Sequence, residues 1–301
     1  MPITDISTSE QKMTTTRLGY IGPGIMGKPM IDNLQKAGYP VTVYARRESQ
    51  RKSLADAGWS VVNTPADVAR QSDIIFICVS DTPDVENVIF GENGLSEGLA
   101  AGKLVIDMST ISALETREFA KRLADIGVNF LDAPVSGGEH GAISGTLSIM
   151  VGGTDESFAR AKPYFEILGQ NIVHVGASGA GQTAKACNQV LVAQTINAVA
   201  EALALAGKAG VDPAKVREAL LGGFANSKIL EVHGQRMLDD NYTPGFKAKL
   251  HQKDMHIVAD MANTLGIELP GANLTTEQMD VLVAQGMGEL DSAALRKLIA
   301  D

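Results

Sequence analysis

A strand, a glycine-rich turn and a helix follow one another near the start of the chain, and this order constrains the fold more than any other feature. Residues 17–21 (RLGYI) predict a short buried strand, and residues 28–37 carry apolar side chains at helical spacing. Between them stands GPGIMG, which fits the pattern G-x-G-x-x-G. Glycines there allow a tight turn and a close approach of the backbone to a pyrophosphate at the positive helix N-terminus. The segment predicts a dinucleotide-binding unit, with cofactor contacts from Gly22, Pro23, Gly24, Ile25, Met26 and Gly27.

Strands and helices go on alternating as far as residue 175. The continuous apolar runs at 73–79 (DIIFICV) and 104–107 (LVID) are typical of strands buried on both faces of a parallel sheet. Further strands are expected at 41–44, 59–62, 145–151 and 172–175, and from 129; helices are expected at 51–57, 65–70, 113–126 and 155–168. The alternation predicts an α/β fold with an N-terminal doubly wound sheet of the Rossmann type.

Residues that follow the buried strands are candidates for ligand contacts. In an open α/β sheet, ligands lie outside the carboxyl ends of the strands. Val79, Ser80 and Thr110 stand at such ends and are predicted to line the cofactor cleft. The alternative for Ser80 and Thr110 is that each caps the helix that follows it.

From Gly179 the pattern changes. A run without proline continues to Lys208 and is apolar on nearly every side, as in a buried core helix or a membrane span. Its polar residues are too frequent for a membrane. More helices are expected at 213–221, 228–237, 247–265, 275–285 and 292–299. We therefore expect residues 1–16 to form a disordered tail, 17–178 the cofactor-binding domain, and 179–301 an all-α domain for substrate binding and oligomerisation, built on the long central helix.

The negative net charge of the chain argues against nucleic acid as a partner. The 301-residue chain has a formal net charge of −9 and a pI of about 5.1, whereas nucleic-acid binding needs a basic surface. Cys78 and Cys187 lie in apolar runs and are expected to be buried free thiols, and no cysteine or histidine has the spacing of a metal site. The polar first 16 residues contain no readable targeting segment, so a cytoplasmic location without membrane attachment is expected.

The end of the second strand bears on the choice of nicotinamide cofactor. NAD-specific sites usually have Asp or Glu there, which binds the ribose 2′-hydroxyl. This chain has Tyr44-Ala45-Arg46-Arg47 and no acid before Glu48. Guanidinium groups can bind a 2′-phosphate bidentately, so Arg46 and Arg47 favour NADP(H), with NAD(H) as the alternative. The simpler interpretation is a solvated pair of surface arginines.

Lys185 is the candidate for acid–base chemistry. It stands within the first turns of the long apolar helix, where desolvation disfavours the ammonium and lowers its pKa. Asn188 and Gln189, three and four residues further on, share its helical face. In the alternative interpretation the side chain reaches solvent near the helix start. The residues by themselves leave both interpretations open.

A Ser-Gly-Gly turn follows the strand that begins at Asn129. In the stretch NFLDAPVSGGEHG, Pro134 ends the strand, and Ser136, Gly137 and Gly138 come next. Glycines leave backbone N–H groups uncovered, and such groups can hold a small carboxylate. A Gly-Gly pair alone is more often an ordinary turn, so the carboxylate interpretation depends on a reactive group elsewhere in the chain.

Four motifs in order resemble the β-hydroxyacid dehydrogenase family over nearly all of residues 17–301. They are GPGIMGKPM at 22–30, DAPVSGG at 132–138, GAGQTAKACN at 179–188 and the pair Lys253-Asp254. The resemblance implies that Lys185 is the catalytic general acid/base and that Thr110, Lys253 and Asp254 join the cofactor contacts. It implies substrate contacts from Ser136, Gly137, Gly138, Asn188, Gln189 and Phe246. Many members have Asn in place of Gln189, and many have Asn-Arg-Thr in place of residues 45–47.

The resemblance implies an oxidoreductase that reduces a small aldehyde-carboxylate with NAD(P)H. The motifs are most similar to the branch that converts tartronate semialdehyde reversibly to D-glycerate. Members that act on 3-hydroxyisobutyrate, glyoxylate or succinic semialdehyde are the alternatives. A non-catalytic NADP(H)-binding protein is the alternative from another class, and Lys185 argues against it. Homodimers or homotetramers are implied too, and the long apolar helix has more hydrophobic surface than a small helical domain can cover.

Overall fold

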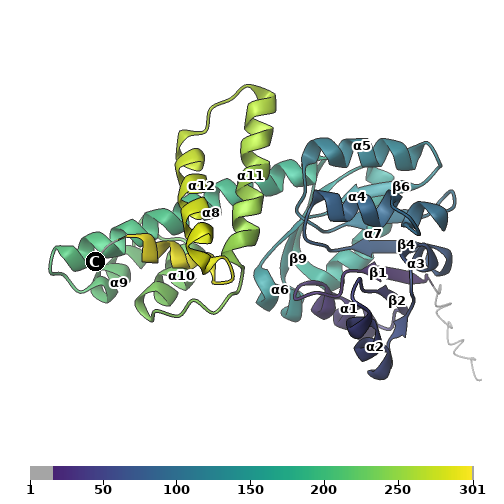
Figure 1. Cartoon of the computed structure of the whole chain (residues 1–301), viewed down its shortest axis with the longest axis horizontal. Coiled ribbons are helices and arrows are strands. Elements are labelled where there is room, and N and C mark those ends of the chain that lie inside the picture. The colour runs from purple at the N-terminus through teal and green to yellow at the C-terminus, as the bar shows by residue number, and fades with distance from the viewer. Residues whose placement is uncertain (1–15, 300–301) are drawn as a thin grey trace, which may run out of the picture.

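The computed structural model describes residues 16–299, which form a sheet domain and a helical domain (Figure 1). The long helix α8 (Ala180–Lys208) starts against the sheet domain and runs through the helical domain. The predicted disordered tail, residues 1–16, lies outside the described residues except for Thr16.

Within residues 16–299, a nine-stranded sheet has the order β3-β2-β1-β4-β5-β6-β8-β7, with β9 paired to β8. Strands β1 to β6 are parallel, β8 is antiparallel to β6 and β7, and β9 is parallel to β8. The chain order reverses between β1 and β4, where open sheets form their ligand crevice. The prediction of a doubly wound sheet is confirmed. The strands are β1 Leu18–Ile21, β2 Val41–Tyr44, β3 Ser60–Val61, β4 Ile74–Ile77, β5 Leu104–Asp107, β6 Asn129–Asp132, β7 Val135–Ser136, β8 Leu147–Gly152 and β9 Gly169–Gly176.

Helices cover both faces of this sheet. They are α1 Gly27–Lys36, α2 Glu48–Asp56, α3 Pro65–Gln71, α4 Thr82–Phe90, α5 Ala113–Ala124, α6 Gly138–Ser144 and α7 Asp155–Leu168, with a 3₁₀ turn at Leu95–Glu97. Two of them, α4 and α6, were not among the predicted elements. Asp81 caps α4 by accepting from the Thr82 N–H at 2.7 Å, and Pro83 stands in its first turn. These start signals precede a short apolar pattern, which is why α4 is easily missed.

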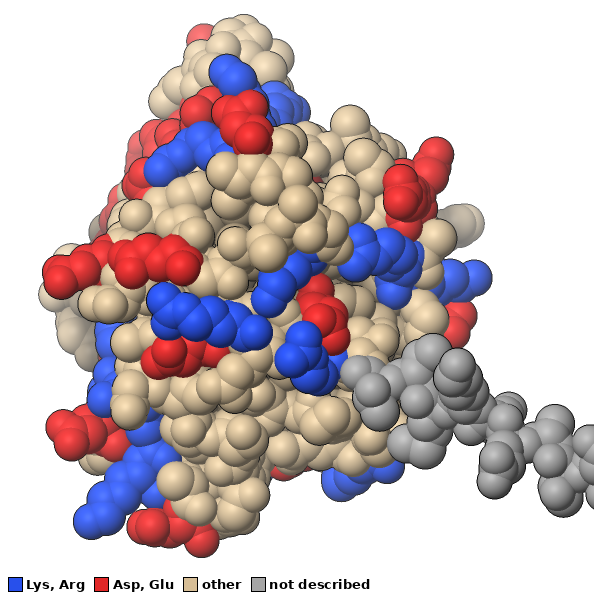
Figure 2. All heavy atoms as spheres, turned by 90° about the vertical axis from the view of Figure 1, so that its right-hand side faces the viewer, with Lys and Arg blue, Asp and Glu red and all other residues tan. Residues whose placement is uncertain are grey.

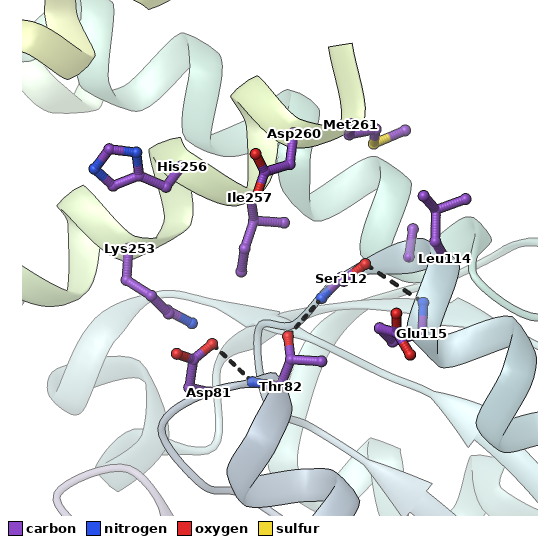
Figure 3. A pocket seen from close by; sticks show the side chains of 11 residues that line it. Asp81, Thr82, Ser112, Leu114, Glu115, Lys253, His256, Ile257, Asp260 and Met261 are labelled. Carbon is purple, nitrogen blue, oxygen red and sulfur yellow. Dashed lines mark hydrogen bonds between the residues drawn. The ribbon is translucent and has the colours of Figure 1, made fainter. Parts of the chain in front are cut away.

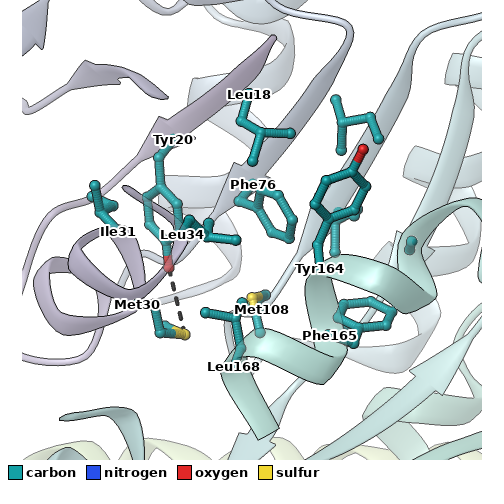
Figure 4. Close-up of a cluster of buried hydrophobic side chains, with 14 of the residues drawn as sticks. Leu18, Tyr20, Met30, Ile31, Leu34, Phe76, Met108, Tyr164, Phe165 and Leu168 are labelled. Carbon is teal, nitrogen blue, oxygen red and sulfur yellow. Dashed lines mark hydrogen bonds between the residues drawn. The ribbon is translucent and has the colours of Figure 1, made fainter. Parts of the chain in front are cut away.

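The apolar core of the sheet domain lies in two layers. One layer joins the sheet to α1 and α7, and the other joins it to α3, α4 and α5. In the first layer, Tyr20 and Phe76 stack with ring centroids 5.9 Å apart, and Tyr164 of α7 packs edge-on against Phe76 (Figure 4). Met30, Ile31 and Leu34 of α1 are fully buried against them, as their helical spacing requires. This packing fixes the start of α1 at the carboxyl end of β1.

The helical domain is built around α8, as predicted. Its other helices are α9 Pro213–Leu221, α10 Lys228–Leu238, α11 Ala248–Leu265 and α12 Pro270–Leu282, followed by a π-helical turn at Val283–Met287 and a 3₁₀ helix at Ser292–Leu298. By length and composition α8 could cross a membrane, but it packs against α10, α11 and α12. Buried Gln182, Lys185, Gln189 and Asn197 on α8 also fit a core helix of a globular domain.

The start of one helix and the burial of one cysteine also differ from the sequence predictions. Helix α12 begins at Pro270 rather than near residue 275, since proline is well accommodated in the first turn of a helix. Cys187 is exposed rather than buried, because its neighbours Ala186 and Gln189 occupy the buried face of α8. Cys78 is half-buried.

The surface of the sheet domain mixes charges of both signs. Figure 2 shows the end of this domain that carries the start of the chain, and basic and acidic side chains alternate across it. That face therefore offers no continuous basic surface of the kind that nucleic-acid binding requires.

Candidate active site

The glycine turn lies at the carboxyl end of β1, and packing requires two of its three glycines. A Cβ on Gly22, whose φ is +93°, would lie 2.1 Å from the Cys78 carbonyl oxygen. A Cβ on Gly27 would lie 2.1 Å from the Gly22 carbonyl oxygen. A Cβ on Gly24 would have no described atom within 4 Å. The bare space over Gly24, at the N-terminus of α1, fits a dinucleotide pyrophosphate. Pro23, Ile25 and Met26 complete the turn.

Arginines gather at the end of β2. Arg46 is largely exposed, and its Nη1 lies 3.0 Å from Oδ1 of Asp84 on α4. Arg47 is exposed and directly precedes α2. Arg51, which the sequence analysis did not single out, donates to the carbonyls of Ala45 and Arg46 at 2.8 and 2.9 Å. Arg46 thus bridges the β2 and β4 ends of the sheet, and no acid other than Asp84 pairs with it among the described residues.

The loops after β4 and β5 are tied to each other. The Val79 N–H donates to Ser109 Oγ at 2.9 Å, and the Ser109 N–H donates to Asp107 Oδ1 at 3.0 Å. Asp107 is fully buried, and burial raises its pKa to about 6. Ser80 is exposed and Thr110 is half-buried, both at the carboxyl edge of the sheet as predicted from their positions. Neither is the N-cap of a helix: Asp81 caps α4 and Ser112 caps α5.

Asp132, at the end of β6, caps the helix that carries Lys185. Its Oδ1 accepts from the Gly179 N–H at 2.8 Å, and its Oδ2 accepts from the Gln182 N–H at 2.9 Å. Burial raises the pKa of Asp132, while these backbone donors lower it. A Cβ on Gly181 would lie 2.8 Å from Asp132 Oδ2, so only glycine permits this approach. Strand β6 therefore fixes the first turn of α8.

Lys185 is buried in the second turn of α8, with 7% of its surface exposed. Burial lowers its pKa to about 8, although the Asp254 carboxylate opposes this shift and Lys253 adds to it. Of the two interpretations of this lysine, the structure agrees with the buried one. An amine with a pKa near 8 can act as acid or base close to neutral pH.

A chain of hydrogen bonds runs from α8 to the sheet domain through α11. Asn188 Nδ2 donates to Gln189 Oε1 at 2.7 Å, and Gln189 Nε2 donates to Asp254 Oδ2 at 2.5 Å. Asp254 Oδ1 lies 2.9 Å from Lys253 Nζ, which donates to the Thr110 carbonyl at 2.5 Å. Lys253 therefore joins the two domains, since it pairs with Asp254 on α11 and donates to the sheet domain.

The Ser-Gly-Gly turn faces the helical domain. Ser136 ends β7, and Gly137 and Gly138 have φ of +135° and +62°. A Cβ on Gly138 would lie 4.0 Å from the carbonyl oxygen of Gly245, which precedes Phe246. The structure thus brings the predicted carboxylate turn opposite the segment that contains Phe246.

Buried polar side chains hold the Phe246 segment in place. Asp291 Oδ2 accepts from the N–H groups of Gly245 and Phe246 at 2.9 and 3.2 Å. The Phe246 ring lies 5.4 Å from the ring of His251. Burial lowers the pKa of His251 to about 3, and the nearby Lys185 contributes, so His251 is neutral. Neither Asp291 nor a buried His251 could be recognised from local sequence patterns, because their partners come from distant segments.

A cavity of about 440 Å³ opens between α4, α5 and α11 (Figure 3). Lys253 is part of its lining, while Lys185 and the Ser-Gly-Gly turn are not. The Thr82 hydroxyl accepts from the Ser112 N–H at 3.1 Å at the floor of the cavity. The cavity is therefore lined by the sheet domain on one side and by α11 of the helical domain on the other.

Comparisons with known proteins agree with this arrangement. Residues 17–176 match the family described as the NAD-binding domain of 6-phosphogluconate dehydrogenase, and residues 179–299 match the family described as NAD-binding of NADP-dependent 3-hydroxyisobutyrate dehydrogenase. The 2-hydroxy-3-oxopropionate reductase of Escherichia coli K12 is 50% identical over 279 residues, which cover 93% of this chain and 95% of that protein. The mouse mitochondrial 3-hydroxyisobutyrate dehydrogenase is 34% identical over 295 residues, covering 95% of this chain and 88% of that protein.

Solved structures are similar to this chain over nearly its whole length. The 3-hydroxyisobutyrate dehydrogenase of Mycobacterium tuberculosis, determined with L-serine, superposes with a TM-score of 0.87 at 30% identity, covering 95% of this chain and 100% of that chain. The chain therefore belongs to the β-hydroxyacid dehydrogenase family and is an NAD(P)-dependent oxidoreductase that acts on CH–OH groups.

Proposed function

We propose that this member of the β-hydroxyacid dehydrogenase family reversibly reduces tartronate semialdehyde to D-glycerate, with Lys185 as general acid. The observation that carries the proposal is the buried Lys185 amine, whose pKa burial lowers to about 8. Such an amine can both give and take a proton near neutral pH. The similarity to the E. coli 2-hydroxy-3-oxopropionate reductase over nearly the whole of both chains supports this substrate.

Lys185 acts at the carbonyl oxygen. NAD(P)H, when bound, supplies the hydride that the carbonyl carbon accepts. Lys185 donates a proton to the oxygen as negative charge develops there, a general-acid contribution of ~10²–10⁴-fold. Asp254 raises the pKa of Lys185 and thereby keeps more of the amine protonated. In the oxidative direction Lys185 takes the proton from the alcohol.

The remaining predicted contacts orient the substrate. Backbone N–H groups of Ser136, Gly137 and Gly138 hold the carboxylate, so that the carbonyl lies within reach of Lys185. Phe246, on the opposite side of the cleft, encloses the substrate. The Asn188 and Gln189 amides orient the substrate or the Lys185 amine, and the hydrogen bond from Gln189 to Asp254 supports that role.

We propose NADP(H) as the favoured cofactor, with NAD(H) as the alternative. Arg46 and Arg47 are exposed at the end of β2, where they can bind a 2′-phosphate. The pyrophosphate lies over the glycine turn, Gly22 to Gly27. The remaining contacts come from the carboxyl edge of the sheet and from α11, namely Val79, Ser80, Thr110, Lys253 and Asp254.

A substrate panel tests the proposal. Initial rates are measured with tartronate semialdehyde, glyoxylate, succinic semialdehyde and, in the oxidative direction, 3-hydroxyisobutyrate, each with both cofactors. We expect the highest kcat/KM with tartronate semialdehyde and NADPH. If another combination of substrate and cofactor gave a higher kcat/KM, that combination would replace the proposed one. Coenzyme binding without any turnover would favour the non-catalytic alternative.

We also propose a homodimer or homotetramer, with residues 179–301 as the domain that associates. Leu191 and Leu205 on α8 are 69% and 72% exposed, and Phe224 between α9 and α10 is fully exposed. Apolar side chains of this size on one domain are typical of a covered subunit interface. Light scattering that finds a 31.7 kDa monomer at micromolar concentration would contradict this proposal.

A further inference from the structure

A side chain of the Lys185 helix binds the peptide groups on both sides of Thr110. Gln182 Oε1 accepts from the Ile111 N–H at 3.1 Å, and Gln182 Nε2 donates to the Ser109 carbonyl at 2.8 Å. Gln182 is 2% exposed, so both hydrogen bonds are made away from water. Loss of the amide would leave a buried donor and a buried acceptor without partners. The Gln182 amide thus pairs with this segment as a neighbouring strand would.

The Thr110 segment is also held by two other parts of the site. Lys253 on α11 donates to the carbonyl of Thr110 itself, and the Val79 N–H donates to Ser109 Oγ. Among the described residues no group hydrogen-bonds to the Thr110 hydroxyl. The main chain of this segment is therefore fixed while its side chain stays available to a ligand.

Gln182 is in turn fixed relative to Lys185. Its own N–H donates to Asp132 Oδ2 at 2.9 Å, which anchors the first turn of α8 to β6. Lys185 follows three residues later on the same face of the helix, less than one turn away. Both side chains are buried. A short rigid path of one helical turn and one amide therefore joins Lys185 to the Thr110 segment.

We propose that Gln182 is a positioning residue that sets the location of Thr110, and of the cofactor it contacts, relative to Lys185. The inference rests on the function proposed above. Carbonyl reduction delivers hydride to the carbon and a proton to the oxygen bonded to it, so the two donors must be held in one geometry. A displacement of ~1 Å at such a site can lower the rate ~10²-fold. Gln182 acts through Thr110 and Lys185 and touches neither substrate nor cofactor.

Gln182→Leu removes both hydrogen bonds and keeps a side chain of similar size. We expect kcat to fall ~10²-fold at saturating substrate and cofactor. NADPH should still bind with wild-type stoichiometry, measured by nicotinamide fluorescence. Because hydride transfer becomes slower, the isotope effect on kcat with C4-deuterated NADPH should rise.

Asn197→Leu is the matched control. Asn197 is a buried amide on the same helix, 8% exposed, with its Nδ2 3.0 Å from Glu201 Oε1 and no hydrogen bond to the described part of the sheet domain. Its replacement removes a comparable polar group about four turns away. We expect wild-type kcat and a wild-type isotope effect from this variant, whatever the change in melting temperature.

Gln182→Glu tests the same idea if Gln182→Leu does not fold. A protonated carboxyl can accept from the Ile111 N–H and donate to the Ser109 carbonyl, as the amide does. A carboxylate has no donor for Ser109, so kcat relative to wild type should fall as pH rises through the pKa of the new carboxyl. Two results would overturn the proposal. One is a ratio of Gln182→Glu kcat to wild-type kcat that does not change with pH. The other is a loss of kcat in Gln182→Leu that is fully explained by a smaller fraction of protein able to bind NADPH. A wild-type protein inactive on the whole substrate panel would instead refute the proposed function.

Discussion

The proposed site has two halves, a cofactor half formed by the predicted cofactor contacts and a chemical half around Lys185, and they are built in different ways. At the cofactor half, short stretches that end β1, β2, β4 and β5 offer backbone groups and open space, as at Gly24. At the chemical half, Lys185 is buried near the charges of Lys253 and Asp254 on α11, and the hydrogen bond between Gln189 and Asp254 spans 65 residues of sequence. Cofactor binding at the first half depends on open space beside the main chain, whereas the chemistry at the second half depends on a buried polar network. Substitutions should therefore impair cofactor binding in the first half and turnover in the second.

The largest expected effect is on turnover and comes from the chemical half. Lys185→Ala removes the proposed proton donor, and we expect kcat to fall by ~10²–10⁴-fold. Since Lys185 is predicted to contact substrate rather than cofactor, the dissociation constant of NADPH should stay near the wild-type value. Steady-state rates and nicotinamide fluorescence measure the two quantities. A near-normal kcat would show that another group supplies the proton.

Lys208→Ala is the control for that experiment. Lys208 is an exposed lysine in the last turn of the same helix. Like Lys185→Ala, this variant removes one positive charge from α8, but at a position outside the site. Both kcat and NADPH affinity should therefore match wild type.

The next effect concerns the glycine turn and separates packing from ligand contact. Gly24→Ala should fold normally, since its Cβ meets no described atom within 4 Å, yet it should weaken cofactor binding about tenfold or more, or ~1.4 kcal/mol. Gly22→Ala should also lower the melting temperature, because its Cβ would lie 2.1 Å from the Cys78 carbonyl oxygen. Calorimetry and NADPH titration compare the variants. Unchanged affinity in Gly24→Ala would argue against a pyrophosphate at this turn.

A smaller change should appear as a shift along the pH axis. The reduction needs the Lys185 ammonium, so kcat/KM should fall as pH rises through its pKa of about 8. Asp254 raises that pKa, and Asp254→Asn should therefore move the fall to lower pH. Rate profiles between about pH 6 and 10 measure the shift. The exposed Asp260 on the same helix provides the control Asp260→Asn, whose profile should coincide with that of the wild type.

The same difference explains which parts of the fold and of the site could be predicted from the sequence. The β1–α1–β2 unit and the long helix α8 follow from local spacing and local glycines, and their predicted bounds agree closely with the structure. Asp132 and Gln182 stand inside recognised motifs, but their roles depend on hydrogen bonds to residues 47 and 71–73 positions away. Hydrogen bonds between residues so far apart cannot be predicted from local sequence patterns. For the same reason, the sequence left the burial of Lys185 open and gave the wrong exposure for Cys187.

The smallest expected effect concerns cofactor choice at the edge of the cofactor half. The Asp84 carboxylate pairs with Arg46 at 3.0 Å, so it competes with a 2′-phosphate for the same guanidinium. Asp84→Asn should therefore raise the ratio of kcat/KM for NADPH to that for NADH. Because the Arg46 side chain is 81% exposed and such a solvent-screened pair is worth at most ~1 kcal/mol, the change should not exceed about fivefold. Glu86→Gln on the same helix is the control, since Glu86 pairs with Arg122 instead and its loss should leave the ratio unchanged. An equal rise in both variants would indicate a general effect of lost negative charge, and no change in either would mean that Arg46 does not contact the 2′-position.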